Sequence, residues 1–257
     1  MEILVCVKRV PTVGGVLTLT ADGRAIDTKA SGFTISPHEE CAVEEAVRLT
    51  ERFGGSVTVA SLGPVAAEEQ LRGCLALGAS AGVLLETADG VETGPIATAA
   101  ALHAVAAAGS FDLVLLGNEA SDTGDYQVGI RLAHLLGRPV ATGIKAISVS
   151  DDGSSLAGSR TYRGILETFT LPLPCVVTVK EGINLPRYPS LPGRLRAKRA
   201  SIARVPVAEP GPASASDVRM TRLRVPEVPR KQVTVLGRGP DAVPALVAVL
   251  AEIGVLS

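Results

Sequence analysis

The segment 113–129 has the residue types of an anion-binding loop. The apolar run Leu113-Val-Leu-Leu is followed by small and polar residues and then by a helical pattern that begins near Asp125. Backbone N–H groups at a helix N-terminus lack intrahelical partners and carry partial positive charge, so they stabilise a phosphate. Open α/β sheets also bind ligands where their strands end. The predicted binding loop consists of Gly117, Asn118, Glu119, Ala120, Ser121, Asp122, Thr123, Gly124, Asp125, Tyr126, Gln127 and Val128.

Helix capping is the plainer interpretation of this loop. Ser121, Asp122 and Asp125 are residue types that accept hydrogen bonds from the first N–H groups of a helix. From the pattern alone, capping is the favoured interpretation. The chain has no Walker lysine motif and no Gly-x-Gly-x-x-Gly motif after a strand, which argues against ordinary P-loop and Rossmann sites.

A second candidate site lies at the start of the first predicted helix. Ser36 and Pro37 followed by Glu39 form a strong helix-start signature, for which capping is again the favoured interpretation. His38 lies at the mouth of this helix. No pattern pairs any of the three histidines with a nucleophile or with further metal ligands, so neither a hydrolytic triad nor a metal site is expected.

Alternating strand and helix patterns predict the elements that position these loops. Buried strands are predicted at Ile3–Val7, Ser56–Ser61, Gly82–Leu85, Leu113–Leu116 and Cys175–Val179. Amphipathic helices are predicted at Glu40–Phe53, Ala66–Leu77, Thr93–Ala108 and Asp125–Leu136. This alternation predicts an α/β fold with a mostly parallel open sheet and helices on both faces.

Three segments depart from the alternation. Residues 16–28 are predicted to form an inserted hairpin, and residues 144–171 a small antiparallel part. From residue 184 the chain is rich in proline and weakly periodic, as is typical of an extended arm. The arm ends in a predicted strand, Gln232–Leu236, and a predicted helix, Ala242–Ile253. We therefore divide the chain into an α/β nucleotide-binding domain, 1–183, and a C-terminal part, 184–257, that is expected to pack on another chain.

Composition narrows the class of protein. The 257 residues carry a formal net charge of −1, which gives no indication of nucleic-acid binding. The four cysteines are scattered and are expected to be reduced core thiols. The first apolar stretch is too short for a signal peptide or a membrane span, so a cytoplasmic protein without direct membrane insertion is expected.

Six blocks of sequence together resemble the β subunit of electron-transfer flavoproteins. They occur in the family's order and span about residues 1–205. The blocks are Val5-Cys-Val-Lys-Arg-Val, Ala42-Val-Glu-Glu-Ala-Val-Arg-Leu, Leu71-Arg-Gly-Cys-Leu-Ala-Leu-Gly-Ala, the loop 113–129, Leu171-Pro-Leu-Pro-Cys-Val-Val-Thr and Asn184-Leu-Pro-Arg-Tyr-Pro-Ser-Leu-Pro-Gly.

The resemblance implies an adenine-nucleotide α-hydrolase-like fold and a heterodimer. The α subunit would hold most of the FAD, while the β subunit would bury an AMP and help to form the FAD site. The implied function is electron transfer from flavin dehydrogenases to an acceptor such as a quinone reductase, with no bond chemistry in this subunit. The implied cofactor contacts are Cys6, Ser36, Pro37, His38, Glu39, Leu62 and the predicted binding loop. With this resemblance, nucleotide binding becomes the favoured interpretation of the loop.

Further expectations follow residue by residue. His38 falls where many members carry an aromatic residue facing the flavin, whereas Val13 falls where some have a tyrosine. Leu191 matches an exposed leucine that anchors onto partner dehydrogenases, with Tyr188 and Pro192 beside it. The alternative is that Leu191 packs under a proline-rich turn.

Departures from the family leave two alternatives open. The ending Gln127-Val128-Gly129 is shared with members that bifurcate electrons and bind a second FAD in this subunit. We favour AMP, because the bulky Tyr126 fits less easily beside a dinucleotide. A stand-alone adenine-nucleotide sensor of the universal stress protein type has the same sheet architecture, but it does not need the long C-terminal arm.

Overall fold

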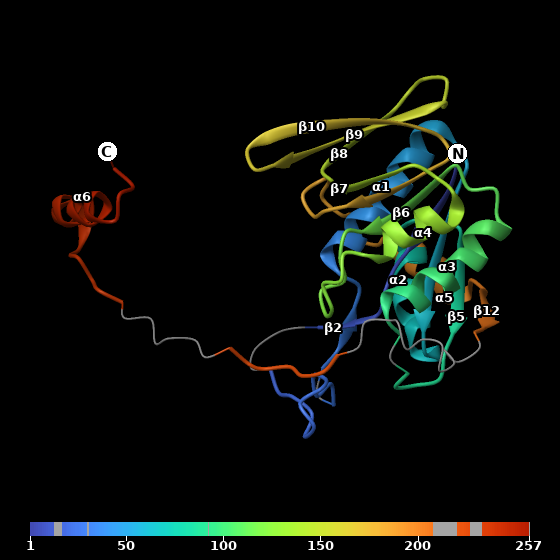
Figure 1. Ribbon diagram of the computed structural model, residues 1–257, viewed down its shortest axis with the longest axis horizontal. Helices are drawn as coiled ribbons and strands as arrows, with labels where there is room; N and C mark the ends of the chain where they lie inside the picture. The colour runs from blue at the N-terminus through green and yellow to red at the C-terminus, as the bar shows by residue number, and fades with distance from the viewer. Residues whose placement is uncertain (13–16, 30, 92, 208–219, 227–232, 257) are drawn as a thin grey trace. The chain divides into compact units, whose positions relative to one another are not determined.

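Seven parallel strands form the central sheet (Figure 1). The computed structural model describes all residues except 13–16, 30, 92, 208–219, 227–232 and 257. These form two units, Met1–Arg222 and Leu223–Ser257. The strand order is β12-β5-β4-β1-β6-β11-β7. The bounds are β1 Glu2–Cys6, β4 Ser56–Gly63, β5 Ala81–Glu86, β6 Leu113–Gly117, β7 Val140–Ile144, β11 Cys175–Val179 and β12 Ile202–Pro206.

The sheet forms where the sequence has short, continuous apolar runs. Ile3, Leu4 and Val5 of the central strand β1 are all fully buried, as expected for a strand covered on both faces. Strand β1 pairs in parallel with β4 on one side and β6 on the other, so the carboxyl ends of these three strands meet at one edge. All five predicted buried strands are confirmed.

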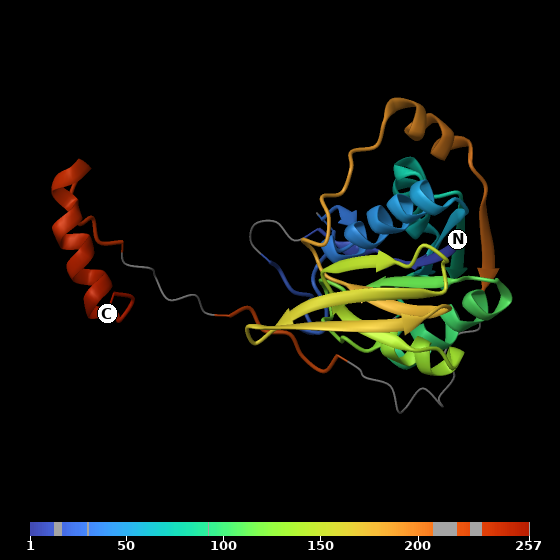
Figure 2. The ribbon, with the colours of Figure 1, turned by 90° about the horizontal axis from the view of Figure 1, so that it is seen from above.

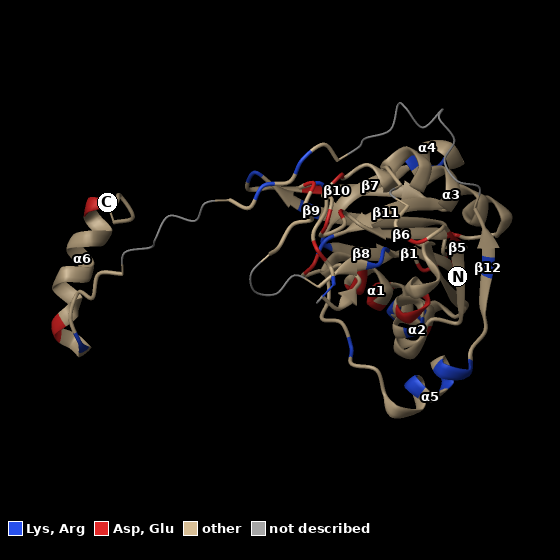
Figure 3. Cartoon of the chain, turned by 90° about the horizontal axis from the view of Figure 1, so that it is seen from below, with Lys and Arg blue, Asp and Glu red and all other residues tan. Residues whose placement is uncertain are grey.

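Helices cover both faces of the sheet, as predicted (Figure 3). The helices are α1 Pro37–Phe53, α2 Glu68–Leu77, which follows a short 3₁₀ turn at Val65–Ala67, α3 Pro95–Ala108, α4 Val128–Leu136 and α5 Leu191–Arg199. One core joins α1 and α2 to strand residues such as Ile3 and Leu113, while the other joins α3 and α4 to Leu4 and Val114. Alternate residues of a strand point to opposite faces, which explains this division.

Strand β7, helix α5 and strand β12 were not predicted. Strand β7 is short and is interrupted by Gly143, whose φ is +67°. Strand β12 is an edge strand with exposed side chains, and its main chain pairs with β5 from Ile202 opposite Gly82. Helix α5 is dominated by basic residues. Helix α5 and strand β12 lack a buried apolar pattern, so the weakly periodic stretch after residue 184 contains more regular structure than the sequence indicated.

The antiparallel part and the inserted hairpin agree with the predictions. Strands β8 Ala146–Val149, β9 Ser155–Tyr162 and β10 Ile165–Pro172 form a three-stranded antiparallel sheet. Arg163 and Gly164 both have positive φ at its tight turn. In the hairpin, Leu19 and Ile26 form an antiparallel bridge, whereas Val16 lies outside the described residues. The short strands β2 Val10–Pro11 and β3 Phe33–Thr34, which precede and follow the hairpin in sequence, pair with each other.

The second unit contains a 3₁₀ turn, η3 Gly239–Ala242, and helix α6 Val243–Glu252. The helix confirms the C-terminal prediction. The predicted strand Gln232–Leu236 is wrong in its described part, because residues 233–236 form no strand. A single strand needs a neighbour for its backbone hydrogen bonds, and an apolar sequence alone does not provide one.

Candidate nucleotide-binding cleft

A cleft lies where the carboxyl ends of β1, β4 and β6 meet. Its wall combines the predicted binding loop with the ends of these strands. The structure brings together, of the predicted residues, Cys6, Glu39, Leu62, Gly117, Asn118, Glu119, Ala120, Thr123, Asp125, Tyr126, Gln127 and Val128. Six predicted residues are sequence neighbours of lining residues but do not line the cleft themselves: Ser36, Pro37, His38, Ser121, Asp122 and Gly124.

Sequence reasoning missed the wall contributed by α3. Thr93, Pro95 and Thr98, from the start of this helix, line the cleft together with Leu102. A proline at the first helical position after the third predicted strand marked this helix start, but no polar motif accompanied it. The other lining residues that the prediction missed are Val7, Lys8, Leu116 and Gly129.

The start of α4 contradicts the capping interpretation of the loop. Helix α4 begins at Val128, three residues later than expected, and its N-cap is Gln127, whose side chain makes no capping hydrogen bond. None of Ser121, Asp122 and Asp125 occupies the capping position. The first turn of α4 therefore presents its backbone N–H groups without a side-chain cap at the wall of the cleft.

Lys8 ties the loop to the end of β1. Its ammonium group lies 2.8 Å from each carboxylate oxygen of Asp122. Within the loop, Gly124 and Tyr126 have φ of +60° and +57°. A hydrogen bond to Glu119 raises the pKa of Tyr126 above its ordinary value. These contacts hold the loop in a defined turn over the cleft.

At the mouth of α1, Ser36 caps the helix, as the capping interpretation predicted. The Ser36 hydroxyl accepts a hydrogen bond from the N–H of Glu39, and the Glu39 carboxylate accepts one of 2.9 Å from the N–H of Ser36. The second carboxylate oxygen of Glu39 accepts a hydrogen bond of 3.0 Å from the N–H of Lys8. Burial raises the pKa of Glu39 to about 8, although these hydrogen bonds oppose the shift. The capping box thus places a buried carboxyl group on the wall of the cleft.

His38 is largely buried behind the loop. Its Nδ1 lies 4.0 Å from Glu119 Oε1 and has no hydrogen-bond partner among the described atoms. Burial lowers the pKa of His38, while the charge of Glu119 opposes the shift. The imidazole is therefore neutral at neutral pH.

Two glycines permit close approach of the elements that build the cleft. A Cβ at Gly117 would lie 2.8 Å from Glu39 Cγ, so any side chain there would push β6 away from α1. A Cβ at Gly129 would overlap the methyl group of Thr178, where α4 packs on β11. The Thr178 hydroxyl in turn lies 2.8 Å from Asn118 Oδ1, which fixes the first residues of the loop.

The three residues predicted to bind a partner lie on the surface far along the chain. Leu191 begins α5 and is 71% exposed, and Tyr188 is 94% exposed. Pro192 follows in the first turn and is exposed. The alternative in which Leu191 packs under the proline-rich turn is therefore wrong.

The described part of the chain contains no membrane-spanning helix, no cluster suited to a metal ion and no disulfide. None of its helices is both long and apolar enough to cross a membrane. Among the same residues, no three His, Cys, Asp or Glu side chains gather in a way that could hold a metal ion. All four cysteines are buried and free.

Comparison with known proteins agrees with the sequence resemblance. The model of the electron transfer flavoprotein domain matches residues 24–210. The β subunit of electron transfer flavoprotein from Bradyrhizobium diazoefficiens is 38% identical over 82% of this chain and 84% of its own. The Homo sapiens β subunit is 34% identical over 99% of this chain and 98% of its own. That from Bacillus subtilis is 37% identical over 68% of this chain and 67% of its own. The chain therefore belongs to the family of electron transfer flavoprotein β subunits.

Proposed function

We propose that this β subunit binds AMP in the cleft and, with an α subunit, completes the binding site of an FAD. The heterodimer would accept electrons from flavin dehydrogenases in the cytoplasm and pass them to an acceptor such as a quinone reductase. FAD, when bound, supplies the electron-carrying chemistry. This chain would contribute binding and orientation, with no bond chemistry of its own.

The observation that carries the proposal is the uncapped N-terminus of α4 at the wall of the cleft. Its N–H groups suit a phosphate. Leu62, Leu102 and Leu116 give the same cleft an apolar wall that suits an adenine ring. A phosphate and an adenine are the two ends of AMP, and both surfaces lie in one cleft.

The size of Tyr126 favours AMP over a second FAD. This bulky side chain lies along the wall of the cleft, where its backbone has a φ of +57°. It leaves less room beside an extended dinucleotide, which supports a mononucleotide.

We also propose that the exposed residues Tyr188, Leu191 and Pro192 contact the partner dehydrogenase. Prolines on both sides of Leu191 restrict the backbone, which lowers the entropy lost on docking. Helix α5 and strand β12 belong to the first unit, so the expected packing on the α subunit applies to the second unit, Leu223–Ser257.

Nucleotide release tests the proposal. The chain is co-expressed with its α subunit, the purified heterodimer is denatured, and the released nucleotides are separated by chromatography. We expect one AMP and one FAD for each heterodimer. Two FAD and no AMP would support the bifurcating alternative. A monodisperse isolated chain that binds ATP without an α subunit would support the sensor.

A further inference from the structure

Exposed apolar side chains gather on the segment between β11 and α5. Leu185, Tyr188 and Leu191 are 91%, 94% and 71% exposed. Single exposed apolar residues are ordinary, but several on one short segment are typical of an interaction surface. We call residues 184–193 the docking segment. In Figure 2 it forms part of an arch, coloured orange, that stands away from the sheet.

Both ends of the docking segment are fixed to the helices of the sheet. At one end, the Asn184 amide donates to the carbonyl of Cys41 at 3.0 Å and to Glu45 Oε2 at 2.9 Å. At the other, Gly193 packs so closely on the carbonyl of Ala76 in α2 that a side chain would not fit. The middle of the segment must be held in another way.

Close packing does not hold the middle of the segment. An open cleft of about 720 Å³ lies between α1, α2 and the arch, and Val47, Leu75 and Tyr188 are among its lining residues. Across an open cleft of this size the chain lacks the dispersion contacts that would otherwise fix it. The segment has room to shift toward the helices.

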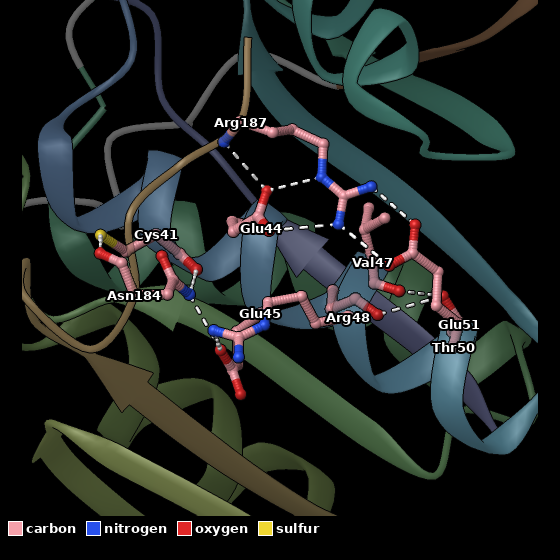
Figure 4. A network of polar contacts seen from close by, with 10 residues as sticks. Cys41, Glu44, Glu45, Val47, Arg48, Thr50, Glu51, Asn184 and Arg187 are labelled. Carbon is pink, nitrogen blue, oxygen red and sulfur yellow. Dashed lines mark hydrogen bonds and ion pairs between the residues drawn. The ribbon is translucent and has the colours of Figure 1, made fainter. Parts of the chain in front are cut away.

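Arg187 bridges this gap with a double fork (Figure 4). Its Nε donates to Glu44 Oε2 at 2.9 Å and its Nη2 to Glu44 Oε1 at 3.1 Å. The same guanidinium donates to both oxygens of Glu51, at 2.6 and 3.0 Å. The backbone N–H of Arg187 also donates to Glu44. Between Asn184 and Gly193, all of which are described, no other side chain has a hydrogen bond to α1 or α2.

The burial of Glu44 makes this contact stronger than an ordinary surface ion pair. Glu44 is 5% exposed, so water screens its charge poorly. Exposed ion pairs contribute about 0–1 kcal/mol to stability. Removing one partner of a buried pair costs more, because it leaves an uncompensated buried charge. Bidentate geometry also fixes the direction of the guanidinium, which a lysine cannot do.

We propose that Arg187 is a positioning residue for partner docking. Its hydrogen bonds to Glu44 and Glu51 hold the docking segment in one arrangement, in which Tyr188 and Leu191 are exposed together. This inference rests on the proposed role of the segment in contacting the dehydrogenase. Without these hydrogen bonds, only a fraction of molecules has the segment in the arrangement that binds. The apparent affinity for the dehydrogenase then falls in proportion to that fraction.

Steady-state kinetics of the complete heterodimer test the inference. The heterodimer is the varied substrate, and the donor is a flavin dehydrogenase that reduces the wild type. We expect Arg187→Ala to raise the KM for the heterodimer about tenfold with kcat and FAD content unchanged. Arg187→Lys should leave the KM nearly as high as Arg187→Ala does, because lysine cannot make the bidentate hydrogen bonds of arginine. Arg204→Ala is the matched control, since it removes an exposed 2.6 Å arginine–glutamate contact with Glu68 at the sheet edge. It should leave KM unchanged.

A double-mutant cycle with Leu191→Ala identifies the route of the effect. If Arg187 acts through the segment, adding Arg187→Ala to Leu191→Ala changes KM little further. Fully multiplicative effects would mean direct contact with the partner and would overturn the inference. If only Leu191→Ala raises KM, the inference is wrong and the docking proposal survives. If neither variant raises KM, the docking proposal itself fails. If Arg187→Ala does not assemble, the double variant Glu44→Gln with Arg187→Gln removes the ion pair without leaving a buried charge. The same changes in KM are expected for it.

Discussion

Lys8 lies 2.8 Å from both carboxylate oxygens of Asp122, so the end of β1 and the loop after β6 are joined beside the cleft. The two residues are far apart in sequence, and the contact fixes the loop next to the site proposed for AMP. The ion pair is partly exposed, which limits its contribution to the stability of the fold. Its main effect should be on the order of the loop.

Asp122→Asn is therefore expected to weaken nucleotide retention more than it weakens folding. The purified heterodimer should contain less AMP, with thermal stability changed by about 1 kcal/mol or less. Chromatography of released nucleotides and thermal unfolding measure the two effects. Asp151→Asn removes a carboxylate from an exposed pair with Arg52 and should leave the AMP content intact. Equal AMP content in both variants would show that the Lys8 contact has no role in binding.

The buried Glu39 predicts a dependence of stability on pH. Burial raises its pKa from 4.5 to about 8 in the folded state, so between these values the folded state binds more protons than the unfolded state. Stability from this group is present at low pH and is lost as pH rises through 8. Burial lowers the pKa of His38 below its ordinary 6.5, which gives the opposite slope only below that pH.

Glu39 should therefore contribute to a fall in stability between pH 6.5 and 8, and because burial also raises the pKa of Glu40, substitution of Glu39 is needed to isolate its share. One proton corresponds to about 1.4 kcal/mol per pH unit, so the heterodimer should lose roughly 1–2 kcal/mol across this range. Glu39→Gln should flatten the profile of thermal unfolding against pH. Glu51→Gln is the control, because hydrogen bonds from Arg187 lower the pKa of Glu51 below 4.5 and outside this range. An unchanged profile in Glu39→Gln would show that Glu39 does not titrate there.

Gly129 and Gly73 offer a matched pair of helix substitutions. Gly129→Ala should destabilise the chain by about 1–3 kcal/mol, because the new methyl group overlaps Thr178 and forces α4 off β11. Gly73→Ala lies in α2 with nothing near its added methyl group and should stabilise it by roughly 0.5–1 kcal/mol. Thermal unfolding compares the two. Equal shifts would mean that α4 does not pack this closely.

The predictable parts of the fold are those that bury continuous apolar runs. Strand β1 is recognisable because Ile3, Leu4 and Val5 must all avoid water. Strand β12 is not, because an edge strand is defined by main-chain pairing with β5, and its exposed side chains carry no pattern. The site follows the same rule. The loop after β6 was predictable from its residue types. The start of α4 at Val128 was not, because several residues of the loop are of types that could cap a helix and the backbone geometry decides among them.

The C-terminal unit supplies the last prediction. Helix α6 has no buried residue, although Val243, Leu246 and Val247 are apolar. A single helix of this kind gains little stability until its apolar side chains meet another surface. We propose that the surface belongs to the α subunit, so the connection before α6 should be accessible to proteases in the isolated chain and protected in the heterodimer.

Trypsin tests this proposal at two defined bonds. Arg222 and Arg224 are exposed and lie outside helices and strands, so both should be cut rapidly in the isolated chain. Arg194 and Arg199 are also exposed but lie in α5, whose Ala197 is buried against the core, and should be cut more slowly. Mass spectrometry of the fragments over time gives the order of cutting, with the denatured chain as the control for intrinsic cleavage. In the heterodimer, cutting after Arg222 and Arg224 should slow by at least an order of magnitude, because the opened state that trypsin needs becomes rare once α6 is bound. Equal cutting rates in the two forms would mean that the C-terminal unit does not pack on the α subunit.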